Sequence, residues 1–162
     1  MTTYTYNPNA TAFVRGSEFT LILDQDQTVT NSTTLETVEA FNITVGRNAR
    51  YLVEYDILFD TTADADFKYS TLSPVGGTAT RYRALAEGVT DAATAATSVL
   101  AAEAAVSITG GGTSGAARYT LFFENGGTAD DQGVLSFQFA QNSADAGDTI
   151  VLAGSRVTVR SY

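Results

Sequence analysis

The sequence has no cysteine and no histidine, and Lys68 is its single lysine. Without cysteine it can form no disulfide, thiolate zinc site or cysteine nucleophile, and without histidine it can form no Ser-His-Asp triad. No run approaches the roughly 20 apolar residues of a transmembrane helix. The first residues also lack the basic and then apolar pattern of a secretory signal. We therefore expect a soluble protein that holds no metal and no cofactor.

Basic residues are scarce in general. Nine lysines and arginines stand against 18 aspartates and glutamates, which gives a formal net charge of −9. Such a charge repels phosphate backbones and anionic lipid, so we expect neither nucleic acid nor a membrane as a partner. The basic residues other than Lys68 are arginines. Arginine suits ion pairs at packed or subunit surfaces, although a codon bias would explain the same preference equally well.

The segment 50–60, RYLVEYDILFD, has a strict alternation. Large residues occupy every second position, and Glu54 and Asp56 lie between them; the large residues are Tyr51, Val53, Tyr55, Ile57 and Phe59. Successive side chains of a strand point to opposite faces, so the pattern predicts a central strand with one buried face and one half-polar face. We expect a hairpin between this strand and the alternating segment 41–45, closed by residues 46–49. The segments 134–140 and 151–159 repeat the alternation and are the other expected pairing partners.

Short alternating segments recur along the rest of the chain, separated by turn residues. They are residues 19–23, 28–30, 67–72, 80–85, 105–109, 118–124, 133–141, 149–152 and 156–162. This spacing predicts an all-β protein, an antiparallel jelly-roll-like β-sandwich formed by one domain, residues 19–162. The alanine-rich segment 91–105 is expected to be a short helix or an ordered excursion.

Residues 1–18 are expected to form an extended N-terminal arm. The arm carries Tyr4, Tyr6, Phe13 and Val14, and Pro8 interrupts any long strand. Because water does not favour these apolar side chains, the arm is expected either to pack on its own domain or to dock on a neighbouring molecule, with docking slightly preferred.

Two groups of carboxylates could carry chemistry. Glu54 and Asp56 share a strand face at about 7 Å between Cα atoms, a separation compatible with the acid and base of a glycosidase. A partly solvated strand face is the better explanation, so we expect no enzyme activity. Asp24-Gln25-Asp26 has the beginning of a cation-binding loop, but the glycine and third aspartate of a calcium loop do not follow. A solvated turn is therefore expected there.

The chain resembles a family of structural proteins found in tailed-bacteriophage virions. The resemblance lies in QTVTNSTTLE, FNITVGRNARYLVEYDILFD and ADADFKYSTLSP, within residues 27–74, and in the C-terminal LSFQFAQNSADAGDTIVLAGSRVTVRSY. In the C-terminal part, an aromatic residue precedes an Ala-Gln-Asn turn, an Asp/Thr-rich loop follows, and Gly-Ser leads into the last strand. These features are Phe139, residues 140–142, residues 145–149 and residues 154–155; the family often has tryptophan where this chain has Phe139.

The resemblance implies a β-rich virion protein, usually trimeric, that serves as a capsid decoration (cement) protein, a head fibre or a tail-tip module. The chain has no coiled-coil heptads and no collagen-like repeat for a fibre stalk, so we expect a decoration protein on the capsid surface, made in the host cytoplasm. Its partners would be the major capsid protein and itself, as a homotrimer. The candidate capsid contacts are Tyr4, Tyr6, Phe13 and Val14, and the candidate subunit-interface residues are Arg81, Arg83, Arg118 and Arg156. The alternative is a receptor- or glycan-binding module of a tail or head fibre.

Overall fold

The computed structural model describes residues 16–46, 49–73, 77–88, 106–108, 114–125 and 133–162, with the backbone alone for 77–88, 106–108 and Asn125. These residues form twelve strands and one 3-10 helix. The elements are β1 (Glu18–Ile22), β2 (Gln27–Thr30), β3 (Glu36–Thr37), η1 (Glu39–Phe41), β4 (Ile43–Val45), β5 (Arg50–Asp60), β6 (Phe67–Leu72), β7 (Gly77–Gly88), β8 (Val106–Ile108), β9 (Ser114–Asn125), β10 (Gly133–Gln141), β11 (Asp148–Val151) and β12 (Arg156–Ser161).

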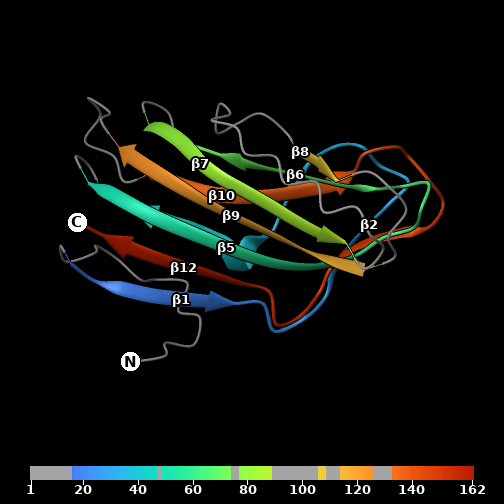
Figure 1. Ribbon diagram of the computed structural model, residues 1–162, viewed down its shortest axis with the longest axis horizontal. Helices are drawn as coiled ribbons and strands as arrows, with labels where there is room; N and C mark the ends of the chain where they lie inside the picture. Colours follow the sequence, from blue (N-terminus) through green and yellow to red (C-terminus); the bar gives the residue numbers. More distant parts are fainter. Residues whose placement is uncertain (1–15, 47–48, 74–76, 89–105, 109–113, 126–132) are drawn as a thin grey trace.

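The strands form two antiparallel sheets. In the seven-stranded sheet, called the large sheet below, β7 pairs with β9, β9 with β5, and β5 with both β12 and β11, which pair in turn with β1 and β2. Figure 1 shows β1, β12, β5, β9 and β7 in this order from bottom to top. The five-stranded sheet, called the small sheet, contains β8, β6, β10, β3 and β4. Because the chain crosses repeatedly between the two sheets, the architecture is the predicted jelly-roll-like β-sandwich.

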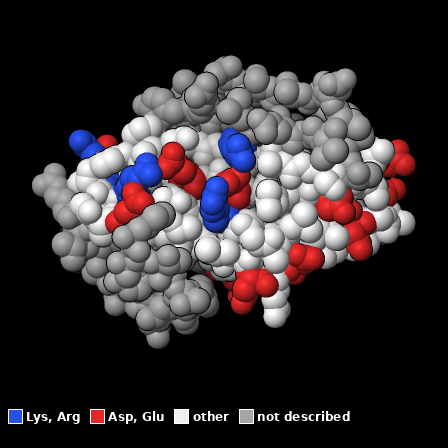
Figure 2. Space-filling view, turned by 60° about the horizontal axis from the view of Figure 1, so that its bottom comes forward, with Lys and Arg blue, Asp and Glu red and all other residues white. Residues whose placement is uncertain are grey.

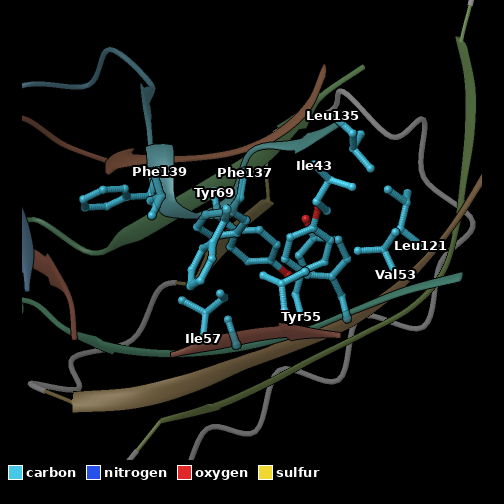
Figure 3. Close-up of a cluster of buried hydrophobic side chains, with 14 of the residues drawn as sticks. Ile43, Val53, Tyr55, Ile57, Tyr69, Leu121, Leu135, Phe137 and Phe139 are labelled. Carbon is cyan, nitrogen blue, oxygen red and sulfur yellow. The ribbon is translucent and has the colours of Figure 1, made fainter. Parts of the chain in front are cut away.

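The core lies between the two sheets. Figure 3 shows Tyr55 and Ile57 of β5 pointing toward Phe137 and Tyr69 of the small sheet, while Val53 lies below Ile43 and Leu135. Aromatic side chains fill much of this space: the rings of Tyr55 and Tyr119 stack with centroids 4.4 Å apart, and those of Tyr69 and Tyr119 lie 5.3 Å apart. The buried face predicted for the central strand is therefore confirmed, and β5 has the predicted bounds.

The prediction that residues 41–45 form a hairpin with the central strand is wrong. β4 pairs with Gly133–Leu135 of β10 in the small sheet, whereas β5 belongs to the large sheet, and Phe41 lies in η1. The connection between β4 and β5 therefore crosses from one sheet to the other. The hydroxyl oxygen of Tyr51 accepts a hydrogen bond from the backbone N–H of Gly46 at 2.7 Å, which fixes the crossing. The alternation in each segment predicts a buried face, but it does not specify the neighbouring strand.

The expected partners of the central strand are half correct. β12 and β11 pair with β5, as predicted for residues 151–159. The segment 134–140 does not, because β10 lies in the opposite sheet and faces β5 across the core, with the rings of Phe137 and Tyr55 5.5 Å apart. β7 is longer than the predicted strand 80–85, and β3 was not predicted. The predicted helix or excursion at 91–105 and residues 1–15 of the arm lie outside the described residues.

The two edges of β5 differ in continuity. On one edge, β9 pairs with all eleven residues of β5, from Arg50 to Asp60, without a register shift. On the other edge, β12 ends its pairing at Asp56 and β11 resumes at Phe59. Four residues, Leu152–Ser155, span this interval, where β5 has two, so the strand makes an excursion there. The Ser155 hydroxyl bridges the gap: it accepts from the Leu58 N–H at 3.0 Å and donates to the Leu152 carbonyl at 2.7 Å.

Candidate interaction surface

The outer face of the large sheet places charged side chains of four strands beside one another. Glu54 and Asp56 project from β5 on the side opposite the core, as their alternation with buried residues predicts. Asp56 accepts hydrogen bonds from two flanking strands: Arg118 of β9 donates through Nε at 2.9 Å, and Arg156 of β12 donates through Nη2 at 2.7 Å. Asp56 therefore joins three strands through two ion pairs.

Glu54 belongs to a second group of ion pairs on the same face. Arg160 of β12 contacts Glu54 at 2.8 Å through Nη1 and Glu18 of β1 at 2.5 Å through Nε. At one end of the face, Arg50 pairs with Glu124 of β9 at 3.2 Å. We call these eight residues the ion-pair face; they are Glu18, Arg50, Glu54, Asp56, Arg118, Glu124, Arg156 and Arg160. Figure 2 shows blue and red groups side by side over the left and centre of this view.

The electrostatics of Asp56 favour its charged form. Partial burial raises the pKa of the carboxyl, but the hydrogen bonds and charges of Arg118 and Arg156 outweigh this effect, so its pKa is lowered. The hydrogen bond from Arg160 to Glu18, together with the charge of Glu54, raises the pKa of Arg160 above its ordinary value. Both shifts result from the ion pairs. The lowered pKa keeps Asp56 ionised at neutral pH, whereas a general acid needs a protonated carboxyl.

The carboxylates of Glu54 and Asp56, which the sequence suggested as an acid–base pair, are thus paired with arginines. Glu54 and Asp56 do lie on one face, but each is held by an ion pair. Within the described ranges, no three His, Cys, Asp or Glu side chains gather where they could hold a metal ion. In the turn Asp24-Gln25-Asp26, the carboxylate of Asp26 accepts the backbone N–H of Ala153 at 2.8 Å, so it stabilises the excursion that Ser155 bridges.

The candidate interface arginines fall into two groups. Arg118 and Arg156, separated in sequence, are brought together on Asp56. Arg81 and Arg83 lie on β7, on either side of a register shift against Leu121 and Thr120, and their side chains are outside the described part, as are Tyr4, Tyr6, Phe13 and Val14. Sequence reasoning missed the other arginines of the face, Arg50 and Arg160. The alternation of the strands could have identified them. Arg50 lies on the same face of β5 as Glu54, and Arg160 lies on the same face of β12 as Arg156.

Exposed apolar side chains also gather on this sheet. Of the six large apolar residues that are exposed in the described part, four lie on strands of the large sheet or directly after one: Ile22, Leu58, Phe122 and Tyr162. The backbone N–H of Tyr162 donates to the carbonyl of Arg50 at 3.0 Å, so this residue lies beside the ion-pair face. Burial raises the pKa of Tyr162, and the charge of Arg160 lowers it in part. The other two, Leu72 and Val134, lie on the small sheet.

The opposite end of the large sheet is acidic. Beyond Leu58 come Asp60 and the loops 61–66 and 142–147, which carry Asp64, Asp66 and Asp145; Asp148 follows at the start of β11. The right side of Figure 2 accordingly shows red groups without blue ones. The Gln141 side chain, fully buried, stabilises this end: its amide accepts the N–H groups of Ser32 and Asp145 at 3.1 and 3.0 Å and donates to the Gly147 carbonyl at 2.6 Å.

Comparisons with known proteins give weak structural likeness only. No family model matches the chain, and no curated protein matches its sequence. Solved structures of infectious bursal disease virus match in part. The Gx strain structure is 17% identical over 99% of this chain and 45% of that chain, with a TM-score of 0.23, and the VP2 subviral particle is 15% identical over 91% and 40%, with a TM-score of 0.24. This chain spans less than half the length of those chains, and a likeness this low does not assign a function.

No helix in the described residues has the length and apolar character that a membrane crossing needs.

Proposed function

We propose that this protein is a structural component of a tailed-bacteriophage virion, a decoration protein that binds the outer surface of the capsid as a homotrimer. The observation that carries the proposal is the sequence resemblance described above. The fold supports it, because an antiparallel β-sandwich is the architecture that the resemblance implies. The major capsid protein and other copies of this chain would be the partners.

The residues that carry the C-terminal resemblance have structural roles in this chain. Gln141, from the Ala-Gln-Asn turn, binds three backbone groups of neighbouring loops. Ser155, from the Gly-Ser pair, bridges the excursion beside β5, and Gly154 adopts a φ of +89°, which favours glycine. The residues of this motif therefore stabilise the sandwich, and their contacts do not call for a catalytic role. This agrees with a structural protein.

We also infer that the protein is not an enzyme. The sequence offers no histidine or cysteine, and the carboxylates that could act as acid and base are paired with arginines. Replacing Glu54 and Asp56 together by Gln and Asn tests this inference. The double variant should leave any degradation of host-surface polymers by the particle unchanged. A loss of degradation, with the fold intact by circular dichroism, would contradict it.

The loops do not favour the glycan-binding alternative. A sugar site at one end of the sandwich would be expected to present exposed aromatic rings. Between β1 and the end of β12, the segments that connect the strands contain one aromatic residue, Phe41, which is fully buried. The other aromatic residues lie in the strands, at the C-terminus and in residues 1–15, so a capsid-binding role is preferred.

Binding to the assembled shell would stabilise it by mass action. A ligand that binds only the assembled lattice lowers its free energy by RT ln(1 + [L]/Kd), about 2.7 kcal/mol per site at a hundredfold excess over Kd. The arm, residues 1–18, would supply contacts, since each aromatic ring such as Tyr4, Tyr6 or Phe13 can bury about 150 to 250 Å². Ordering the arm costs about 1 to 2 kcal/mol per residue. Backbone pairing with a sheet edge and three arms per trimer would offset this cost.

A binding titration on undecorated capsids tests the proposal. The full-length protein should saturate the capsids and raise the temperature at which they disrupt. A variant lacking residues 1–15 should keep the β-sheet signal in circular dichroism but reach lower occupancy at each concentration. Absence of binding by the full-length protein would contradict the decoration role. Equal occupancy of both proteins would show that the sandwich, and not the arm, makes the contact.

A further inference from the structure

The ion-pair face is electrically neutral in a strongly acidic chain. Its eight charged residues comprise four arginines and four carboxylates, and every one of them is paired on the face. The formal charge of the whole chain is −9. The entire net charge is therefore carried by residues outside the ion-pair face, including the aspartates of the acidic end.

This distribution determines how two copies of the chain can approach each other. Two molecules of charge −9 repel at long range, and at physiological salt the repulsion extends over a Debye length of about 8 Å. An approach through the acidic end brings like charges together. An approach through the ion-pair face brings neutral surfaces together and keeps the acidic end away from the contact.

The face also offers apolar area. Ile22 and Phe122 are 49% and 39% exposed, and Leu58 and Tyr162 lie on or beside the same face. Four strands at about 4.8 Å spacing and eight residues at about 3.4 Å give a surface on the order of 500 Å² per copy. Two copies would bury on the order of 1,000 Å², which is the lower bound for a specific protein–protein interface.

The outer side of the small sheet is not equally open. Its central outer positions are already buried within the chain: Ser70 is 2% exposed, Ser136 is 7% exposed, and Ala140 is fully buried. Leu72, at the end of β6, and Val134, near the start of β10, are the exceptions at 48% and 45% exposure. Of the two outer sheet faces, the large sheet therefore offers the wider accessible surface.

We propose that the outer face of the large sheet, with Ile22 and Phe122 among its apolar contacts, is the surface through which copies of this chain associate. The proposal deepens the proposed function, on which it rests for the expectation that copies of the chain associate. It concerns the surface used in a contact between two copies and not the number of copies in the oligomer. Because the contact joins neutral apolar surfaces of acidic molecules, association should strengthen as salt screens the repulsion between them. An interface held by ion pairs between copies would weaken instead.

The chain offers a closely matched pair of variants for the test. Ile22 and Leu72 are both aliphatic, both end a strand, and are 49% and 48% exposed. Ile22→Lys and Leu72→Lys change the net charge by the same amount, but only the first lies on the proposed surface. Phe122→Lys provides a second variant of the face if Ile22→Lys does not fold. Circular dichroism and thermal melting serve as folding controls.

Sedimentation velocity across protein concentration, at low and at physiological salt, measures the association. The wild type should form oligomers more tightly at the higher salt. Ile22→Lys or Phe122→Lys should raise the dissociation constant by about tenfold or more, as expected when one large apolar contact is lost. Leu72→Lys should stay within about twofold of the wild type.

Three results would overturn the proposal. A wild type that stays monomeric at all concentrations shows no self-association; the capsid titration then still decides the decoration role by itself. Equal weakening by Ile22→Lys and Leu72→Lys would place the contact elsewhere. A monomeric wild type whose capsid occupancy falls in Ile22→Lys, but not in Leu72→Lys, would assign the face to a different protein.

Discussion

The two edges of β5 form pairings of different kinds. On the β9 edge, backbone pairing continues over all eleven residues of β5, and no side chain replaces a backbone partner in the ladder. On the edge shared by β11 and β12, four residues leave the ladder, and the hydroxyl of Ser155 replaces the missing backbone partner of Leu58. The comparison shows two ways to maintain one sheet. The first depends on the apolar core beneath it, and the second depends on individual polar side chains.

The side chains with these polar roles lie in the segment that resembles virion proteins. Ser155 bridges the excursion, and Gln141 fixes the loop that leads into β11. β1 and β2 continue the same arrangement, since the Leu23 backbone exchanges hydrogen bonds with Ser155 and Gly154 at 2.9 and 2.8 Å. A buried polar group must be hydrogen-bonded, so these positions tolerate few residue types. An apolar core position accepts several residues of similar volume.

The largest expected effect is on the uninterrupted edge. Tyr119 of β9 is 3% exposed, and its ring stacks on Tyr55 at 4.4 Å. Tyr119→Ala should lower the free energy of unfolding by about 3 to 5 kcal/mol, because it leaves a cavity among the core aromatics. Urea denaturation gives the value. Thr120→Ala, on the outer side of the same strand, should cost less than about 1 kcal/mol. Similar losses in both variants would contradict the dependence of this edge on the core.

Gln141→Ala should have the next largest effect, on the interrupted edge. The change removes one buried amide and leaves two backbone N–H groups and one carbonyl without that partner. A loss of about 2 to 4 kcal/mol is expected, since each unsatisfied buried group costs about 1 to 3 kcal/mol and water can satisfy some of them. Gln138→Ala is the matched control: its amide donates one hydrogen bond, to Thr37. Equal losses in the two variants would show that Gln141 has no special role.

Ser155→Ala should cost about 1 to 2 kcal/mol, because the N–H of Leu58 loses its acceptor. Hydrogen exchange provides a local measurement: the amide of Leu58 should exchange faster, while amides paired across the β5–β9 ladder keep their protection. Ser143→Ala, at an exposed serine in a loop, serves as control and should change neither quantity. Unchanged protection of Leu58 in Ser155→Ala would contradict the bridging role of the hydroxyl.

The smallest effect should come from Asp56, whose ion pairs join both edges of β5. Because the arginines are more than half exposed, Asp56→Asn should cost less than about 1 kcal/mol at neutral pH. The pKa of Asp56 is lowered in the folded protein, so its contribution is complete above the ordinary aspartate pKa of about 3.9 and is lost as the pH falls through the lowered value. The stabilities of wild type and variant should therefore converge in acid. A difference that persists there would exclude the ion pairs as its cause.

The local sequence pattern was sufficient to predict part of the ion-pair face. The alternation in Arg50–Asp60 predicted that Glu54 and Asp56 share one face of a strand, and they do. It did not predict their partners, because Arg118 and Arg156 are 62 and 100 residues away from Asp56 in the sequence. The neutrality of the face is a property of four strands together, so no single segment reveals it.

The sequence by itself determined which residues of the central strand face the core. A buried face needs an apolar residue at every second position, and this is a local property that Tyr51 to Phe59 display fully. Only the tertiary structure decided which strands are neighbours. The segment 43–45 was compatible with a hairpin to β5, yet it pairs with β10 in the other sheet. Backbone hydrogen bonds are the same for every pair of strands, so the choice depends on how all inner faces pack together across the sandwich, through contacts between residues far apart in the chain.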